Sequence, residues 1–214
     1  MSSNTVKLSL FLCLSMCLGI GILRFSYTAL LPGTREAFVW SASFASLLGS
    51  ANLLGYLMGA FAAMRLPQDR SMSTYIQLAA IAGMVSLFCC AFSGFSEIWY
   101  ISWRVISGIS GGLLMILSPS VVAQCCDLKD RFKINFIGFS GIGLGVLLAT
   151  LFLPYLDQIS IRTAWLILCG FALMICICLS LLIQQFKPYL AKQSVSHAAQ
   201  VPLNTVFYSL LAVY

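Results

Sequence analysis

Long apolar segments without a single charge recur along the chain, separated by short polar breaks. Asp, Glu, Lys and Arg are absent from residues 37–64, 71–96, 105–126, 134–156 and 163–186. A helix of about 20 residues crosses a hydrocarbon layer of about 30 Å, so each segment is long enough to span a membrane. The segments are apolar on all sides, whereas a soluble amphipathic helix keeps a polar face. The pattern therefore predicts an all-α integral membrane protein.

The same pattern places six membrane spans and the beginning of a seventh. We expect the spans near residues 8–31, 41–64, 73–95, 97–122, 133–154 and 164–186. A further apolar segment begins near Leu203 and is cut off at Tyr214, after too few residues to cross a bilayer. Composition supports this layout, since 60% hydrophobic and 8% charged residues provide too little polar surface for a soluble globule. The lipid bilayer is therefore the first expected partner.

Basic residues collect on one side of this membrane layout. Those at the N-terminus and in the second, fourth and sixth loops are Lys7, Arg65, Arg70, Lys129, Arg131, Lys133, Lys187 and Lys192. The loops on the other side contain only Arg35 and Arg162. Because Lys and Arg in short loops resist translocation, we expect the N-terminus in the cytoplasm. All the tryptophans then fall on the outer side, in the headgroup region that an indole ring prefers.

Charge and cysteine content point to no other macromolecular partner and to no cofactor. Membrane orientation accounts for the net charge of +6, and no basic stripe interleaved with aromatic residues indicates nucleic-acid binding. The nine cysteines lie mostly within the spans, without paired CxxC spacing next to histidines. We therefore interpret them as small apolar packing residues and expect no metal site.

Two arginines inside the predicted spans are the sharpest chemical feature. Counting along the helices places Arg24 in span one and Arg104 in span four at a similar depth, about 10–12 Å from the outer membrane surface. An ionised side chain at that depth is costly and usually faces a polar cavity. Every acidic residue falls in a loop or at a span end, so an anionic substrate could be the missing partner of both arginines. Snorkelling to the headgroups or bonding to backbone carbonyls is the structural alternative.

Small residues recur at four-residue spacing in three of the predicted spans. They are Ala51, Gly55, Gly59 and Ala63 in the second span, Gly108 and Gly112 in the fourth, and Gly141, Gly145 and Ala149 in the fifth. Such stripes let helices approach closely. Their presence in the second helix of each group of three indicates a three-plus-three internal repeat, an arrangement common in secondary transporters. Ordinary tight packing in a helical bundle explains any single stripe equally well.

Three segments give the chain a specific family resemblance. GIGILRFSYTALLP at residues 19–32 and SANLLGYLMGA at residues 50–60 resemble the opening of the YbfB/YjiJ-type branch of the major facilitator superfamily. RVISG, from Arg104 to Gly108, is similar to the RxxxG signature in the fourth helix of that superfamily. The resemblance implies twelve helices in two six-helix halves joined by a cytoplasmic loop, with this chain as the N-terminal half.

The resemblance also implies a division of the chain. Residues 1–186 would form the six-helix transmembrane half, residues 187–202 the cytoplasmic interdomain loop, and residues 203–214 the start of a truncated seventh helix. The partners would then be a missing C-terminal half or a second copy, and the location a multi-pass position in the bacterial inner membrane.

By the same resemblance, the function is secondary active transport of a small solute by alternating access rather than enzymatic catalysis. Spans one and four would line the cavity, with Arg24 and Arg104 as anion contacts. Weaker polar contacts to the substrate would come from Tyr27, Thr28 and Asn52. Spans two and five would turn their small-residue stripes toward the opposite half.

Two other interpretations stay open at this point. An incomplete half could be inactive, or it could dimerise as a six-helix membrane protein. A rhomboid-type intramembrane protease would use one of the two GxSG strings, which begin at Gly108 and Gly138. A serine nucleophile needs a base, however, and the one histidine, His197, lies beyond span six.

Overall fold

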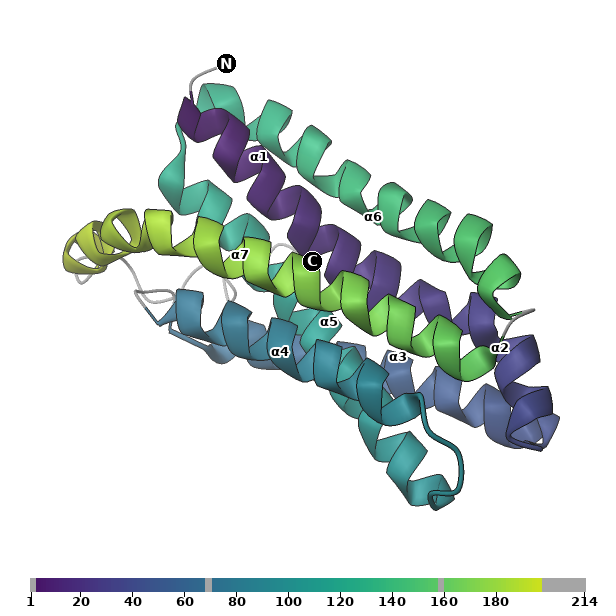
Figure 1. Cartoon of the computed structure of the whole chain (residues 1–214). Helices are drawn as coiled ribbons and strands as arrows, with labels where there is room; N and C mark the ends of the chain where they lie inside the picture. Colours follow the sequence, from purple (N-terminus) through teal and green to yellow (C-terminus); the bar gives the residue numbers. More distant parts are fainter. Residues whose placement is uncertain (1–2, 68–70, 158–159, 198–214) are drawn as a thin grey trace, which may run out of the picture.

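The computed structural model describes residues 3–67, 71–157 and 160–197, which form helices and no strand (Figure 1). In chain order the elements are α1 (Ser3–Met16), the π-helix η1 (Cys17–Phe25), α2 (Ser26–Ala37), α3 (Ala42–Arg65), α4 (Met72–Cys90), α5 (Glu97–Cys125), α6 (Leu128–Asp157) and α7 (Ile161–His197). Six of the described helical segments are long and apolar enough to cross a membrane, which confirms the six predicted spans. The predicted segment from Leu203 to Tyr214 lies outside the described residues.

The first span is one continuous helical rod made of α1, η1 and α2. Its membrane-capable part runs from Asn4 to Ala37, well beyond the predicted residues 8–31. Hydropathy marks where the chain enters and leaves the apolar layer, whereas backbone hydrogen bonding continues into the polar flanks. For the same reason α7 runs to His197, so residues 187–197 of the predicted interdomain loop are helical.

Serine caps start two of the helices that return through the membrane. The Ser41 hydroxyl accepts a hydrogen bond from the Phe44 N–H (3.1 Å) at the start of α3, and the Ser96 hydroxyl accepts one from the Trp99 N–H (3.4 Å) at the start of α5. Both caps satisfy a backbone donor that the first helical turn leaves free. Val39, in the turn between α2 and α3, has a φ of 56°, a left-handed conformation that β-branched residues rarely adopt.

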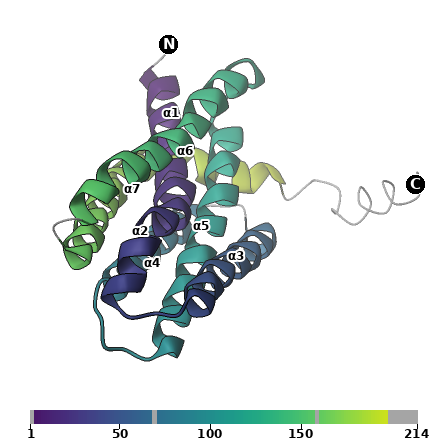
Figure 2. The same cartoon turned by 90° about the vertical axis from the view of Figure 1, so that its right-hand side faces the viewer.

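The small residues of the second span pack against the fourth span within this bundle. A Cβ atom at Gly55 would collide with the backbone of Val105, and one at Gly59 would collide with the backbone of Ile109. Gly108 and Gly112 face back onto the α3 backbone in the same way. Ala51 and Ala63, the ends of the stripe, are buried. The two helices lie side by side because these glycines put no side chain between the two backbones (Figure 2).

The fifth span makes an equivalent seam with the first. A Cβ atom at Gly141 would collide with the Cys13 backbone, and Gly145 lies against Gly21 of η1, while Ala149 is buried. The expectation that spans two and five turn these stripes toward an opposite half is therefore wrong, because α5, α1 and η1 already fill them. A repeat relating spans 1–3 to spans 4–6 would map the seam between spans two and four onto the seam between spans five and one. The two seams fit the three-plus-three arrangement.

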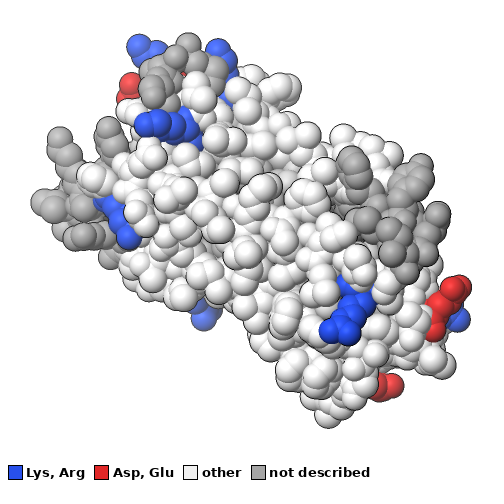
Figure 3. Space-filling view, viewed as in Figure 1, with Lys and Arg blue, Asp and Glu red and all other residues white. Residues whose placement is uncertain are grey.

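On the face seen in Figure 3, the middle of the molecule carries almost no charged side chains. Lys, Arg, Asp and Glu gather at the two ends of this face. The helices cross this middle region, and leucines and phenylalanines of α3, α6 and α7 are exposed there. Such a surface suits hydrocarbon rather than water.

Candidate functional site

Arg104 is buried in the middle of the bundle. It is 2% exposed on α5, a helix that contacts all five of the other spans. Its guanidinium carbon lies 4.3 Å from the centroid of the Tyr27 ring, and the Cys90 thiol is also close enough to interact electrostatically. Its Nε atom has no hydrogen-bond partner among the described residues. An aromatic ring and a thiol therefore lie beside a charge that no acidic side chain of the described residues neutralises.

Three hydrogen bonds fasten the neighbouring helices together around Arg104. The Tyr27 hydroxyl donates to the Ala45 carbonyl (2.8 Å), which ties α2 to α3. The Asn52 amide donates to the Arg104 carbonyl (3.1 Å) and the Ser107 hydroxyl donates to the Leu23 carbonyl (3.2 Å), which tie α5 to α3 and to η1. The polar ends of Tyr27 and Asn52, both predicted substrate contacts, are thus committed to packing in this conformation.

Arg24 has a different environment, near the C-terminal end of η1. It is half-buried, and its guanidinium carbon lies 5.3 Å from the Tyr56 ring centroid and 5.6 Å from that of Phe25. Thr28, the remaining predicted contact, is exposed. The two arginines stack on different rings: Arg104 on Tyr27, and Arg24 on Phe25 and Tyr56. The single anion site predicted for both arginines stays a prediction.

The π-helical segment that carries Arg24 is a feature that the sequence reasoning missed. Gly21 has no side chain to keep α6 away, and Gly19 lies less tightly against Leu114 and the Gly111 carbonyl of α5. The Ser26 hydroxyl donates to the Ile22 carbonyl, next to the Leu23 carbonyl that Ser107 occupies. A π-helix changes the carbonyl pattern of a helix and occurs often at functional sites. The alternation of glycines in CLGIGILRF was the available signal, but hydropathy alone does not register it.

The two GxSG strings lie in ordinary helix. The Ser110 hydroxyl donates to the Ile106 carbonyl and the Ser140 hydroxyl donates to the Ile137 carbonyl, which are bonds within a single helix. His197 is the last residue of α7, and its side chain is not among those described.

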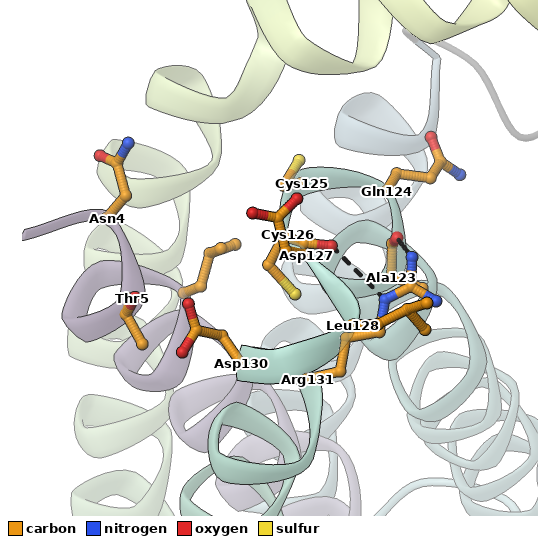
Figure 4. Close-up of a pocket in the computed structure, with 11 residues that line it drawn as sticks. Asn4, Thr5, Ala123, Gln124, Cys125, Cys126, Asp127, Leu128, Asp130 and Arg131 are labelled. Atoms are coloured by element: carbon orange, nitrogen blue, oxygen red, sulfur yellow. Dashed lines mark hydrogen bonds between the residues drawn. The ribbon is translucent and has the colours of Figure 1, made fainter. Parts of the chain in front are cut away.

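A polar pocket of about 490 Å³ lies at the end of the helical bundle where α1 and α6 begin (Figure 4). Arg131 donates to the Ala123 and Cys126 carbonyls there, which caps the end of α5. Burial raises the pKa of the Cys126 thiol, and the nearby Arg131 opposes that effect. Neither Arg24 nor Arg104 lines this pocket.

Comparison with known proteins links these features to a family of transporters. The family model described as "Uncharacterised MFS-type transporter YbfB" matches residues 16–214. No curated protein sequence matches the chain.

Two solved structures share the fold. The proton:xylose symporter XylE of the major facilitator superfamily, bound to 6-bromo-6-deoxy-D-glucose, is similar at a TM-score of 0.72 and 19% identity, over 92% of this chain and 52% of that chain. A structure titled as a D-xylose-proton symporter is similar at a TM-score of 0.61 and 19% identity, over 91% of this chain and 52% of that one. The chain thus spans about half the length of these structures.

The matched family consists of transporters and not of enzymes. The hypothesis of a rhomboid-type protease is therefore wrong. The chain is an integral, multi-pass membrane protein. It belongs to the YbfB-type family of major facilitator superfamily transporters.

Proposed function

We propose that the protein transports a small anionic solute across the bacterial inner membrane by alternating access, with its N-terminus in the cytoplasm. The observation that carries the proposal is the buried Arg104, whose Nε atom has no hydrogen-bond partner and which has no acidic neighbour in the described part of the chain. An isolated charge in the membrane interior is costly. The presence of this arginine therefore favours a ligand that supplies the opposite charge during part of the transport cycle.

Arg24 and Arg104 have different parts in this proposal. Arg24 is half-buried and its guanidinium contacts two aromatic rings, so it is the arginine that a solute would reach first. Arg104 would become available when Tyr27 leaves its guanidinium face. Because α2, α3 and α5 meet at the Tyr27–Ala45 and Asn52–Arg104 hydrogen bonds, loss of these contacts would accompany a rearrangement of the helices.

The six described spans provide one wall of a transport cavity, and the proposal needs a second wall. A C-terminal half of the same fold is the partner that we favour, and a second copy of this chain is the alternative. Cross-linking of cysteines introduced on α3 and α6 would distinguish the two, since a homodimer joins identical positions.

Uptake measurements test the proposal. Labelled monocarboxylates, dicarboxylates and phosphate would be offered to cells that express the protein in full, as its own gene encodes it. Arg24→Ala and Arg104→Ala are each expected to abolish uptake of the transported anion while membrane insertion stays normal, and Arg65→Ala, at an exposed arginine, is the matched control. Normal uptake by both variants would rule out an anion site built on these arginines.

A further inference from the structure

The beginning of α6 carries the most exposed aromatic group in the described part of the chain. Phe132 is 81% exposed, Leu128 79% and Phe136 74%. Among the described large apolar side chains only Val39, in a turn, is more exposed than Phe132. The Phe132 and Phe136 rings lie nearly parallel, with centroids 6.5 Å apart. These residues succeed one another at four-residue intervals, so they form a single row on one face of the helix.

Two lysines form the neighbouring row on the same side of α6. Lys129 and Lys133 are exposed, one turn apart, and each follows a member of the apolar row in sequence. The next row faces the protein, because Ile134 is fully buried and Gly138 packs on Leu12. Asp130 belongs to that inward row and lines the polar pocket, and Arg131 is bonded to the end of α5 (Figure 4). The exposed face is therefore apolar and positively charged, with its nearest acids, Asp127 and Asp130, beside the pocket.

One turn further along α6, the same face carries two small residues, Ser140 and Gly143, before the exposed Leu144. Ser140 continues the row of Leu128, Phe132 and Phe136, and a Cβ atom at Gly143 would meet no other atom within 4 Å. The face thus has two ammonium groups and two aromatic rings interleaved at the start of α6, and open space at Gly143 further along the helix. An anionic phospholipid offers a partner for each feature, with a phosphate for the ammonium groups and apolar parts for the rings and the open space.

We propose that the face formed by Leu128, Lys129, Phe132, Lys133, Phe136 and Gly143 binds an anionic phospholipid. Lys129 and Lys133 contact the phosphate and the headgroup, the two phenylalanine rings cover the glycerol region, and an acyl chain lies along Ser140 and Gly143. Charge complementarity selects an anionic lipid over a zwitterionic one, since two ammonium groups converge on one headgroup. This site is independent of the transported solute.

Native mass spectrometry of the natively encoded protein in detergent micelles tests the proposal, with phosphatidylglycerol and phosphatidylcholine added separately. Phosphatidylglycerol is expected to stay bound where phosphatidylcholine does not. Lys129→Gln together with Lys133→Gln should weaken phosphatidylglycerol binding about 25-fold, at about fivefold for each lysine. Lys7→Gln together with Lys187→Gln makes the same charge change on α1 and α7 and should leave binding within about twofold.

Equal binding of the two lipids, or equal losses in both double variants, would overturn the proposal. If the α6 variant does not fold, a photoactivatable phosphatidylglycerol answers the question in the unmodified protein. Covalent attachment within residues 128–143 supports the site, and attachment elsewhere alone contradicts it. Protein contacts that cover these residues, found by cross-linking in place of lipid adducts, would also contradict it.

Discussion

Arg24 and Arg104 show how differently two arginines in one membrane bundle can be held. Arg104 is enclosed by helices on every side, with Tyr27 across its guanidinium plane. Arg24 is half-buried on a π-helical segment and stacks on Phe25 and Tyr56. Burial makes the cost of a charge large at Arg104 and moderate at Arg24. The difference indicates that the environment of Arg104 depends on the close packing of the bundle, whereas Arg24 lies where the bundle is accessible.

The strongest way to break this comparison is to open the seam that encloses Arg104. Gly108→Leu places a side chain against the Asn52 carbonyl and the Tyr56 backbone nitrogen, so α3 and α5 must separate. We expect a loss of about 3 kcal/mol in the free energy of unfolding, or no folded protein at all. Gly143→Leu, at a glycine with open space around it, is the matched control and should fold normally. Size-exclusion chromatography with a fluorescent fusion compares the yield of folded protein from the two variants. Equal yields would contradict the close contact of α3 and α5 at Gly108.

The two stacking rings sharpen the comparison. Tyr27→Leu removes a desolvated cation–π contact to Arg104 and is expected to cost about 2 kcal/mol. Tyr56→Leu removes the corresponding contact to the half-buried Arg24 and should cost about 1 kcal/mol or less. Tyr27→Phe separates the ring from the hydroxyl that bonds to Ala45. Unfolding titrations in mixed micelles measure these values, and the reverse order would contradict the different environments of the two arginines.

A smaller effect is expected at the bond that connects the two regions. Ser107→Ala leaves the Leu23 carbonyl without its hydroxyl donor and should cost about 1 kcal/mol. Ser107→Thr retains a hydroxyl group and should recover most of that loss. Ser120→Ala is the control, because the Ser120 hydroxyl bonds only within its own helix. If Ser107→Ala and Ser120→Ala behave alike, the bond between α5 and η1 contributes nothing particular.

Hydropathy and charge predicted the spans of this protein because the membrane imposes a simple rule on every helix. A long apolar segment with few or no charges is favoured to cross the membrane, and each of the six observed spans is such a segment, although the first and fourth contain an arginine. Four-residue spacing also identified Gly55, Gly59, Gly108 and Gly141 as packing positions. It could not identify their partners, because a smooth stripe fits α5 of the same half as well as a helix of another half.

The candidate site was predictable only in its residue types. An arginine inside a long apolar segment is visible in the sequence, and both arginines were predicted in this way. Their separate ring contacts depend on the rotation of η1, which a π-helix alters without changing hydropathy. The hydrogen bonds that commit Tyr27 and Asn52 to packing join residues distant in sequence, so no local pattern records them.

The stability of Arg104→Met in the natively encoded protein tests most directly whether Arg104 is retained for a ligand. Methionine fills similar space without a charge and can contact the Tyr27 ring through its sulfur. If an anionic solute is the missing partner, the free energy of unfolding without solute should be unchanged or higher by about 1–4 kcal/mol. A loss of about 3 kcal/mol or more would mean that Arg104 holds the bundle together, and would contradict the proposed role.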